Sequence, residues 1–252
     1  MDALLVRHSL VLNMSRNPSI RRMINDIEDL IKGESLGGFA QPQLIPVPDE
    51  LDAEIPRVVF TSQAGHTQVV VSQVSVTFNA NYSPDWQSNP EKCRDYLLSK
   101  VDLLFKIAAV GWKHAKSPHF GGVTTVFRIP ADSKAASVAL LAPVFSDRDT
   151  MSDKANELSC RWSLDERQQF FNNVALQTFI TLDEQLMIAA DGIPRINEST
   201  ITACGVEIIS DYNDRLAFNG REHYITNVET VREMLSSGFE AAKNAVETLR
   251  QG

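Results

Sequence analysis

The sequence lacks the features that mark membrane, secreted and disulfide-rich proteins. No apolar run approaches the roughly 18 to 20 residues that a membrane-spanning helix needs, so we expect no membrane protein. Residues 1–15 have no small-residue cleavage site, and an arginine and a histidine interrupt their apolar part, which argues against a secretory signal. The three cysteines, Cys93, Cys160 and Cys204, are odd in number and far apart, which argues against a disulfide framework or a CxxC metal site. We therefore expect a cytoplasmic protein with buried thiols.

A basic stripe is also missing. The chain has 24 Lys and Arg against 32 Asp and Glu, which gives a net charge of −8. A domain that neutralises many phosphates normally shows a basic stripe, whereas the basic doublet here is Arg21-Arg22, so we expect no nucleic acid as the main ligand. Residues 119–252 carry 19 acidic and 12 basic residues. This acidity either suits a basic protein partner or serves solubility alone.

Recognisable catalytic motifs are absent. The sequence contains no GxxxxGK[ST] phosphate loop and no GxSxG nucleophile turn. Gly121-Gly122 precedes a predicted strand without the following helix that would hold a pyrophosphate. His114 and His119 are separated by Ser117-Pro118, so they cannot share a helical face as a metal pair does. No cofactor is expected, and whether the protein is an enzyme stays open, with a non-enzymatic role favoured.

Carboxylates gather at two places. One group comprises Glu207, Asp211 and Asp214, and the other lies within residues 147–153. Oxygen ligands of this kind can hold a hard cation, but neither group has the central glycine and closing glutamate of an EF-hand loop. We interpret the first as a strand-to-helix turn and the second as a solvated loop, with no metal ion.

The C-terminal residues 226–251 show the clearest pattern in the chain. Apolar residues recur there at steps of three and four, which predicts a long helix with one continuous apolar stripe. They are Val228, Val231, Leu235, Phe239, Ala242, Val246 and Leu249. Such a stripe either packs on the sheet of the same chain or binds another chain. Val246 and Leu249, at the end of the helix, are the candidates for partner binding if they project beyond the sheet.

The remaining pattern predicts an α+β fold with antiparallel sheets and long helices on one face. Strands are expected at 4–13, 57–61, 66–82, 120–129, 158–164, 168–182, 184–190 and 200–210, and helices at 18–32, 89–112, 132–142 and 226–250. Residues 66–82 are long for one strand, so we expect a break near Ser72-Gln73. Residues 33–56 form an irregular loop rich in proline and glycine, either wrapped on the domain or acting as a flap. Residues 1–117 and 118–252 repeat the same element order, which suggests two similar halves.

Several short motifs are arranged in a recognisable order. A strand pair with glutamine leads into the asparagine-rich strand that ends at Asn81, and the turn 82–86 carries Tyr and Trp. A mid-chain strand ends in Arg128-Ile129, and the last helix has the step Phe239-Glu240. This order resembles a sporadically distributed bacterial family of uncharacterised proteins of similar length. Phe127 stands where that family usually has Asn. The resemblance implies the fold from residue 57 onward, and the scattered distribution would suit an accessory of mobile or defence systems.

Two functions follow as hypotheses. The first is a non-catalytic interaction module that binds a protein partner or itself, within a bacterial homo-oligomer or larger assembly. The second is a small-ligand receptor or enzyme with a site between sheet and helices, beneath the loop 33–56. Polar residues near predicted strand ends are the ligand-binding candidates for that site: Asn79, Asn81, Arg128, Asp211 and Asp214.

Overall fold

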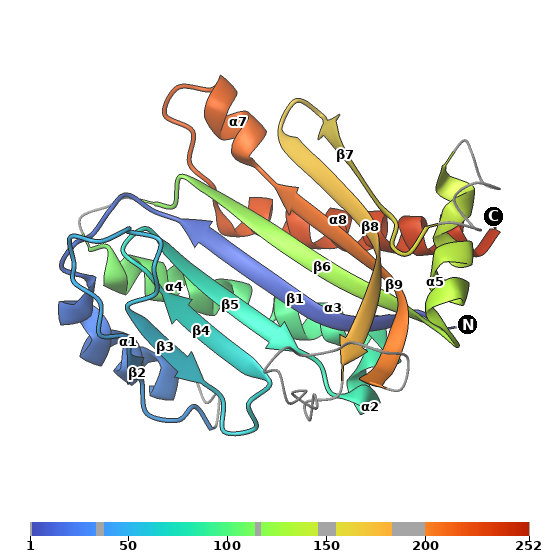
Figure 1. Cartoon of the computed structure of the whole chain (residues 1–252). Helices are drawn as coiled ribbons and strands as arrows, with labels where there is room; N and C mark the ends of the chain where they lie inside the picture. Colours follow the sequence, from blue (N-terminus) through green and yellow to red (C-terminus); the bar gives the residue numbers. More distant parts are fainter. Residues whose placement is uncertain (1, 34–37, 114–116, 146–154, 183–199, 252) are drawn as a thin grey trace.

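A single nine-stranded antiparallel sheet organises the protein (Figure 1). The computed structural model describes residues 2–33, 38–113, 117–145, 155–182 and 200–251. The strands are β1 (Leu4–Asn13), β2 (Gln43–Leu44), β3 (Val58–Thr61), β4 (Thr67–Val71), β5 (Ser75–Asn81), β6 (Phe120–Ala131), β7 (Ser159–Glu166), β8 (Phe170–Leu182) and β9 (Ile201–Asn213). Their order across the sheet is β2-β3-β4-β5-β1-β6-β9-β8-β7. The sheet and its helices confirm the predicted α+β class.

The longer helices pack on one face of this sheet. The helices are η1 (Ile20–Met23), α1 (Ile24–Gly33), α2 (Pro84–Gln87), α3 (Pro90–Leu98), α4 (Val101–Gly111), α5 (Lys134–Leu141), η2 (Ala142–Val144), α7 (Arg215–Gly220) and α8 (Val228–Gln251). Figure 1 shows α3, α4 and α8 behind the sheet, and α8 contacts β6 and β9. The opposite face of the sheet is called the open face below. Side chains alternate between the two faces along each strand.

The sheet is joined at its centre by β1 and β6, which pair in antiparallel register from Leu4↔Arg128 to Asn13↔Phe120. Outward from this pair the order is β5, β4, β3 and the two-residue β2 on one side, and β9, β8 and β7 on the other. Two copies of one unit would give such an order. The similarity of the halves 1–117 and 118–252 stays a prediction, which a superposition of the two would test.

Most predicted elements are found close to their expected bounds, with informative differences. The 66–82 segment is the hairpin β4-β5, and the expected break near Ser72-Gln73 is confirmed, with the Ser72 hydroxyl accepting hydrogen bonds from the amides of Val74 and Ser75. The turn restarts the alternation, so Val69 and Val71 face the core before it and Val76 and Phe78 after it, whereas one unbroken strand would have placed Val70 and Val74 with Val76. The predicted 89–112 helix divides into α3 and α4, and the predicted strand 184–190 lies outside the described residues.

The apolar stripe of α8 is covered by the chain's own core. Phe239 and Ala242 are fully buried, and at Gly238 the helix approaches β9 so closely that a Cβ would lie 2.9 Å from the Cβ of Tyr212. Val246 and Leu249 are each only 5% exposed and belong to the same core. The condition for partner binding, that these two residues project beyond the sheet, is therefore not met, and neither is available to a partner.

Beneath α8 the centre of the sheet carries a buried row of polar side chains on β1, β6 and β9. His8 pairs with Thr125, and Thr125 pairs with Ser210; all three are fully buried. The Tyr82 hydroxyl donates to the Cys93 carbonyl at 2.9 Å and lies 3.0 Å from His8 Nδ1. Since that hydroxyl has one hydrogen, Nδ1–H of His8 is the donor to Tyr82. Burial lowers the pKa of His8 to about 3, so its imidazole is neutral in the folded protein.

The buried His8 makes stability depend on pH. Its folded pKa of about 3 lies below the ordinary histidine pKa of 6.5, so only the unfolded chain takes up the proton between these values. Its contribution is therefore fully present above about pH 6.5 and is lost as the pH falls. We expect the free energy of unfolding to fall by about 2 kcal/mol between pH 7 and pH 5 through this group alone. Urea denaturation at both pH values measures the change.

The matched variant is His8→Phe, which removes the titrating ring and leaves the Tyr82–Cys93 hydrogen bond in place. Between pH 7 and pH 5, the free energy of unfolding of this variant should fall by about 2 kcal/mol less than that of the unaltered protein. Identical pH dependence of the two proteins would show that His8 is not neutralised by burial.

Candidate functional site

The strand register arranges the open face into rows of side chains that cross the sheet. Directly paired residues of antiparallel strands place their side chains beside one another on the same face. One row is polar on eight successive strands: Thr61, Gln68, Asn79, Ser9, Thr124, Asp211, Asn173 and Ser163. The sequence places these residues far apart, and the register alone brings them into line.

A second row lies beside this polar row, two residues further along each strand. It runs Arg7–Val126–Ile209–Ala175–Arg161 across β1, β6, β9, β8 and β7. These five residues are called the trough. Its middle is apolar, with Val126 only 1% exposed and Ile209 and Ala175 partly exposed, whereas its two ends are exposed arginines. The trough is bordered on its other side by a shorter polar row on β6, β9, β8 and β7: Arg128, Glu207, Gln177 and Ser159.

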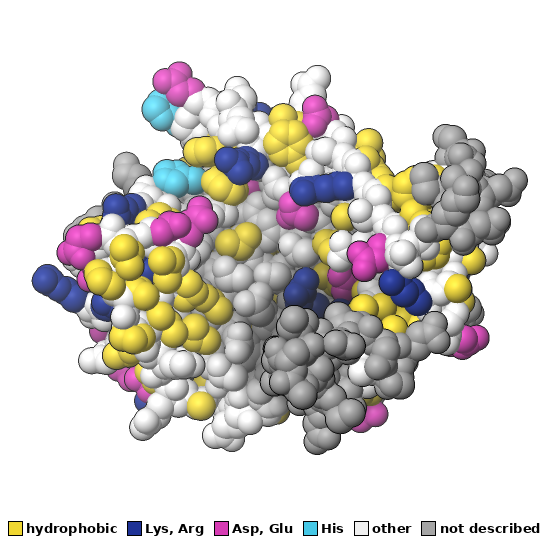
Figure 2. All heavy atoms as spheres, viewed as in Figure 1, with side chains coloured by type: hydrophobic (Ala, Val, Ile, Leu, Met, Phe, Trp, Pro, Cys, Tyr) yellow, Lys and Arg dark blue, Asp and Glu magenta, His cyan; other side chains and the backbone are white. Residues whose placement is uncertain are grey.

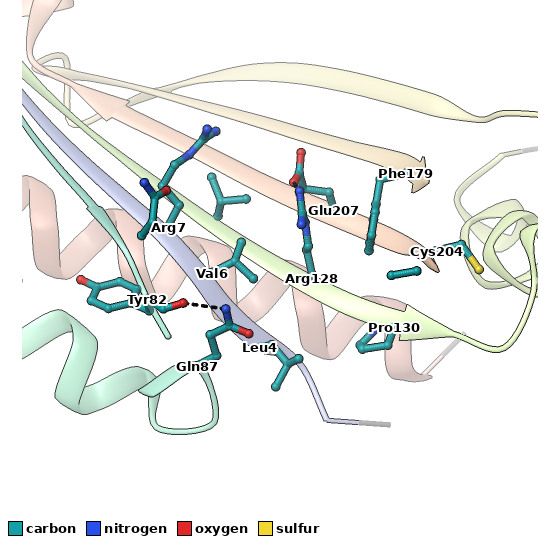
Figure 3. A pocket seen from close by; sticks show the side chains of 13 residues that line it. Leu4, Val6, Arg7, Tyr82, Gln87, Arg128, Pro130, Phe179, Cys204 and Glu207 are labelled. Carbon is teal, nitrogen blue, oxygen red and sulfur yellow. Dashed lines mark hydrogen bonds and ion pairs between the residues drawn. The ribbon is translucent and has the colours of Figure 1, made fainter. Parts of the chain in front are cut away.

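A cavity of about 400 Å³ lies at the β1 end of the trough (Figure 3). Arg128 donates from both Nε and Nη2 to Oε1 of Glu207, each at 2.9 Å. The other carboxylate oxygen of Glu207 accepts from the Gln177 amide at 3.0 Å. These bonds hold the Arg128 guanidinium in one place and neutralise most of its charge.

An aromatic ring closes this cavity beyond Arg128. The Arg128 guanidinium carbon lies 4.5 Å from the centre of the Phe179 ring, a cation–π distance. Phe179 pairs with Gly205, where a Cβ would collide with the Ile129 carbonyl and lie 2.9 Å from the Phe179 ring. The absence of a side chain at Gly205 therefore makes room for the ring.

Arg7 gives the cavity its positive charge. It pairs with Asn81 on β5 and is a diagonal neighbour of Arg128 on β6, where side chains lie roughly 7 to 8 Å apart. In the part of the chain that the structure describes, Arg7 makes no hydrogen bond or ion pair through its side chain. Two guanidinium groups against the Glu207 carboxylate leave this cavity with one net positive charge, in a chain of net charge −8.

A second cavity, of about 450 Å³, lies at the β7 end of the trough. It is lined by Arg161, Ala175 and Ile209 of the trough and by polar residues of the bordering rows. Asp211 is held there by the amides of Asn173 and Asn213, at 3.0 and 3.1 Å from its Oδ2. Ile209 lines this cavity, and Val126, with which it is paired across β6 and β9, lines the first cavity. The two cavities are therefore neighbours along the trough.

The sequence candidates divide between these positions. Asn81 and Arg128 line the first cavity, Asp211 lines the second, and Asn79 lies in the eight-residue polar row. These four are on the open face, not between sheet and helices as expected. The residues that sequence reasoning missed are Arg7, Arg161, Gln177 and Phe179. The alternation along residues 4–13 could have identified Arg7, since it puts that residue on the face opposite Leu10 and Leu12.

Asp214 belongs to the framework rather than to this site. It is fully buried, and its carboxylate accepts from the Gly121 amide at 2.7 Å and from the Tyr224 hydroxyl at 2.8 Å. Burial raises its pKa, an effect that these donors oppose. The carboxylate thus fastens the end of β9 to the start of β6, which corrects its assignment as a ligand-binding residue.

The carboxylates and thiols among the described lining residues are held by hydrogen bonds or shielded by burial. Glu207 and Asp211 are occupied by hydrogen-bond donors, and the Cys204 thiol donates to the Ala131 carbonyl at 3.3 Å. Burial raises the pKa of the Cys160 thiol, which disfavours its reactive thiolate. Within the described ranges, no group of three or more metal-ligating side chains occurs. The acidic group 147–153 lies outside those ranges.

Comparison of the chain with protein-family models found no match, and comparison with curated proteins found none either. Across the described residues, no helix is both long enough and apolar enough to cross a membrane.

The loop before β3 is wrapped on the domain. Arg57 is fully buried and donates to the carbonyls of Ile55, Asp52 and Leu51, at 2.5, 3.2 and 3.4 Å, with its Nε 3.5 Å from Asp49 Oδ1. Described residues of this loop line neither trough cavity. A site beneath the loop 33–56 therefore stays a prediction, distinct from the candidate site on the open face.

We expect Arg57→Leu to release this loop. The substitution leaves several carbonyls without a donor and Asp49 without its buried partner, so the free energy of unfolding should fall by about 3 kcal/mol. Limited proteolysis should then cut within residues 45–55. The exposed Arg22 supplies the control, since Arg22→Leu should change stability by less than about 0.5 kcal/mol. An uncut loop in the Arg57→Leu protein would contradict this account of the anchor.

Proposed function

We propose that this protein is a non-catalytic interaction module that receives a protein partner on the open face of its sheet. The observation that carries the proposal is the trough between two polar rows, with a cavity at each end. Amide, hydroxyl and carboxylate groups on both borders match the donors and acceptors of a peptide backbone. In the apolar middle, Ile209 and Ala175 are partly exposed and supply a surface that a partner's side chains can cover.

The framework suits this role because it fixes the rows before any partner arrives. The trough side chains stand on five neighbouring strands, and the helices behind them are packed into one core. A rigid surface loses little conformational entropy on binding. Most of the conformational entropy lost on binding would then be that of the partner, if the partner is a flexible segment that becomes extended on the sheet.

A receptor for a compact small molecule is the second candidate. The first cavity, of about 400 Å³, falls in the range of ligand sites, and it combines charged, amide and aromatic groups. The continuation of the trough into a cavity of about 450 Å³ favours an elongated partner instead. A second copy of the chain is a further protein partner, in line with the expected homo-oligomer.

Selection of displayed random peptides on the purified protein tests the proposal. We expect enriched peptides whose binding is weakened at least tenfold by Ala175→Trp, because the indole would fill the middle of the trough. Ser159→Trp, at the exposed border of the second cavity, should weaken the same peptides. The control is Asn244→Trp on the exposed side of α8, which should leave binding unchanged.

Circular dichroism and light scattering of all the variants accompany the binding assay. Peptides that bind the Ala175→Trp and Asn244→Trp proteins equally well would place the binding surface elsewhere. A folded, strictly monomeric protein that enriches no peptide would overturn the proposal.

A further inference from the structure

Each end of the trough carries an arginine that has no partner among the described residues. Arg128 is neutralised by Glu207, whereas neither Arg7 nor Arg161 has a side-chain hydrogen bond or ion pair within the described part of the chain. Both are exposed. Charge complementarity therefore calls for a ligand with a negative group near each end and none between them.

The strand spacing sets the distance between those negative groups. Arg7 is on β1 and Arg161 on β7, four strand-to-strand steps apart across β6, β9 and β8. Neighbouring strands lie about 4.8 Å apart, which puts the two backbone positions roughly 19 Å apart. An extended peptide covers the same length in about six residue steps of roughly 3.3 Å.

The floor between the arginines fits the alternation of such a peptide. In an extended segment every second side chain points to the same side. If its first and seventh side chains reach the two arginines, its third and fifth point toward the partly exposed apolar residues Ile209 and Ala175, beside the buried Val126. The intervening side chains point to solvent.

We propose that the trough binds an extended peptide segment that carries carboxylates six residue steps apart, one on Arg7 and one on Arg161, with small or apolar side chains facing the floor between them. This inference rests on the proposed function and names the chemistry of the partner.

A single nucleic-acid strand fits the same surface poorly. Over roughly 19 Å it would bring several phosphates, about one for each 3.4 Å of a helical strand. The trough offers two free cations, and the carboxylates of Glu207 and Asp211 stand on its borders. A peptide with two separated carboxylates avoids this repulsion.

The test uses a seven-residue peptide with blocked ends, glutamate at positions one and seven, valine at three and five, and serine elsewhere. Calorimetric titration at low salt should show it binding about tenfold more tightly than the peptide with glutamine at positions one and seven. Arg7→Gln and Arg161→Gln should each weaken the glutamate peptide about threefold and leave the glutamine peptide unchanged. A peptide with glutamates at positions one and three should lose most of the advantage.

Reversing the charge of both arginines tests the proposed charge complementarity more stringently. The double variant Arg7→Glu, Arg161→Glu should bind the corresponding lysine peptide better than the glutamate peptide. Arg22→Glu, the same charge reversal at one exposed arginine of η1 outside the trough, should preserve the original preference.

Equal binding of the glutamate and glutamine peptides, with both weakened by Ala175→Trp, would overturn the inference and leave the proposed function standing. Absence of binding by every one of these peptides, or tighter binding of a short oligothymidylate, would overturn the inference as well. The proposed function fails separately, in the display selection, if enriched peptides are insensitive to Ala175→Trp.

Discussion

The pairing of β1 with β6 is the interaction on which the rest of the structure depends. It joins strands more than a hundred residues apart in the chain and turns two groups of strands into one sheet. Its register sets which side chains become neighbours on both faces at once. On the helix side it places His8 against Thr125, and on the open side it places Ser9 against Thr124. A shift by one residue would move the leucines of β1 to the open face, so core packing holds the register firmly.

The same pairing explains why the candidate site is a row rather than a pocket within the core. The described helices of greatest length use one face of the sheet, so the other face must be stable without their cover. Polar rows achieve this, and they leave a strip of apolar side chains between them. Figure 2, in the same view as Figure 1, shows a hollowed region over the central strands, with basic and acidic side chains around it. Binding at such a surface needs no opening of the fold.

The sequence indicated the fold class because its signals are local. The three- and four-residue steps of 226–251 and the alternation of 4–13 reflect the faces that each element buries. Only part of the candidate site could be predicted, because its contacts are not local in the sequence. Arg128 and Asn81 could be chosen as polar residues near strand ends, but their meeting with Arg7 and Glu207 depends on strand order and register, which local patterns do not encode. The role of Arg57 as an anchor was equally hidden, since an arginine next to a strand is ordinarily expected in solvent.

The buried polar row beneath α8 shows how the framework favours specificity over stability. Side-chain atoms of His8, Thr125 and Ser210 lack hydrogen-bond partners within the described residues, and each such group costs roughly 1 to 3 kcal/mol. Apolar residues there would make a more stable core, but a sheet centre that is apolar over its full length would also tolerate more than one packing of α8. The close approach at Gly238 and the Tyr82–His8 hydrogen bond select one arrangement. Since the trough residues Val126 and Ile209 follow Thr125 and precede Ser210 on the same strands, fixing the buried row also fixes the open face.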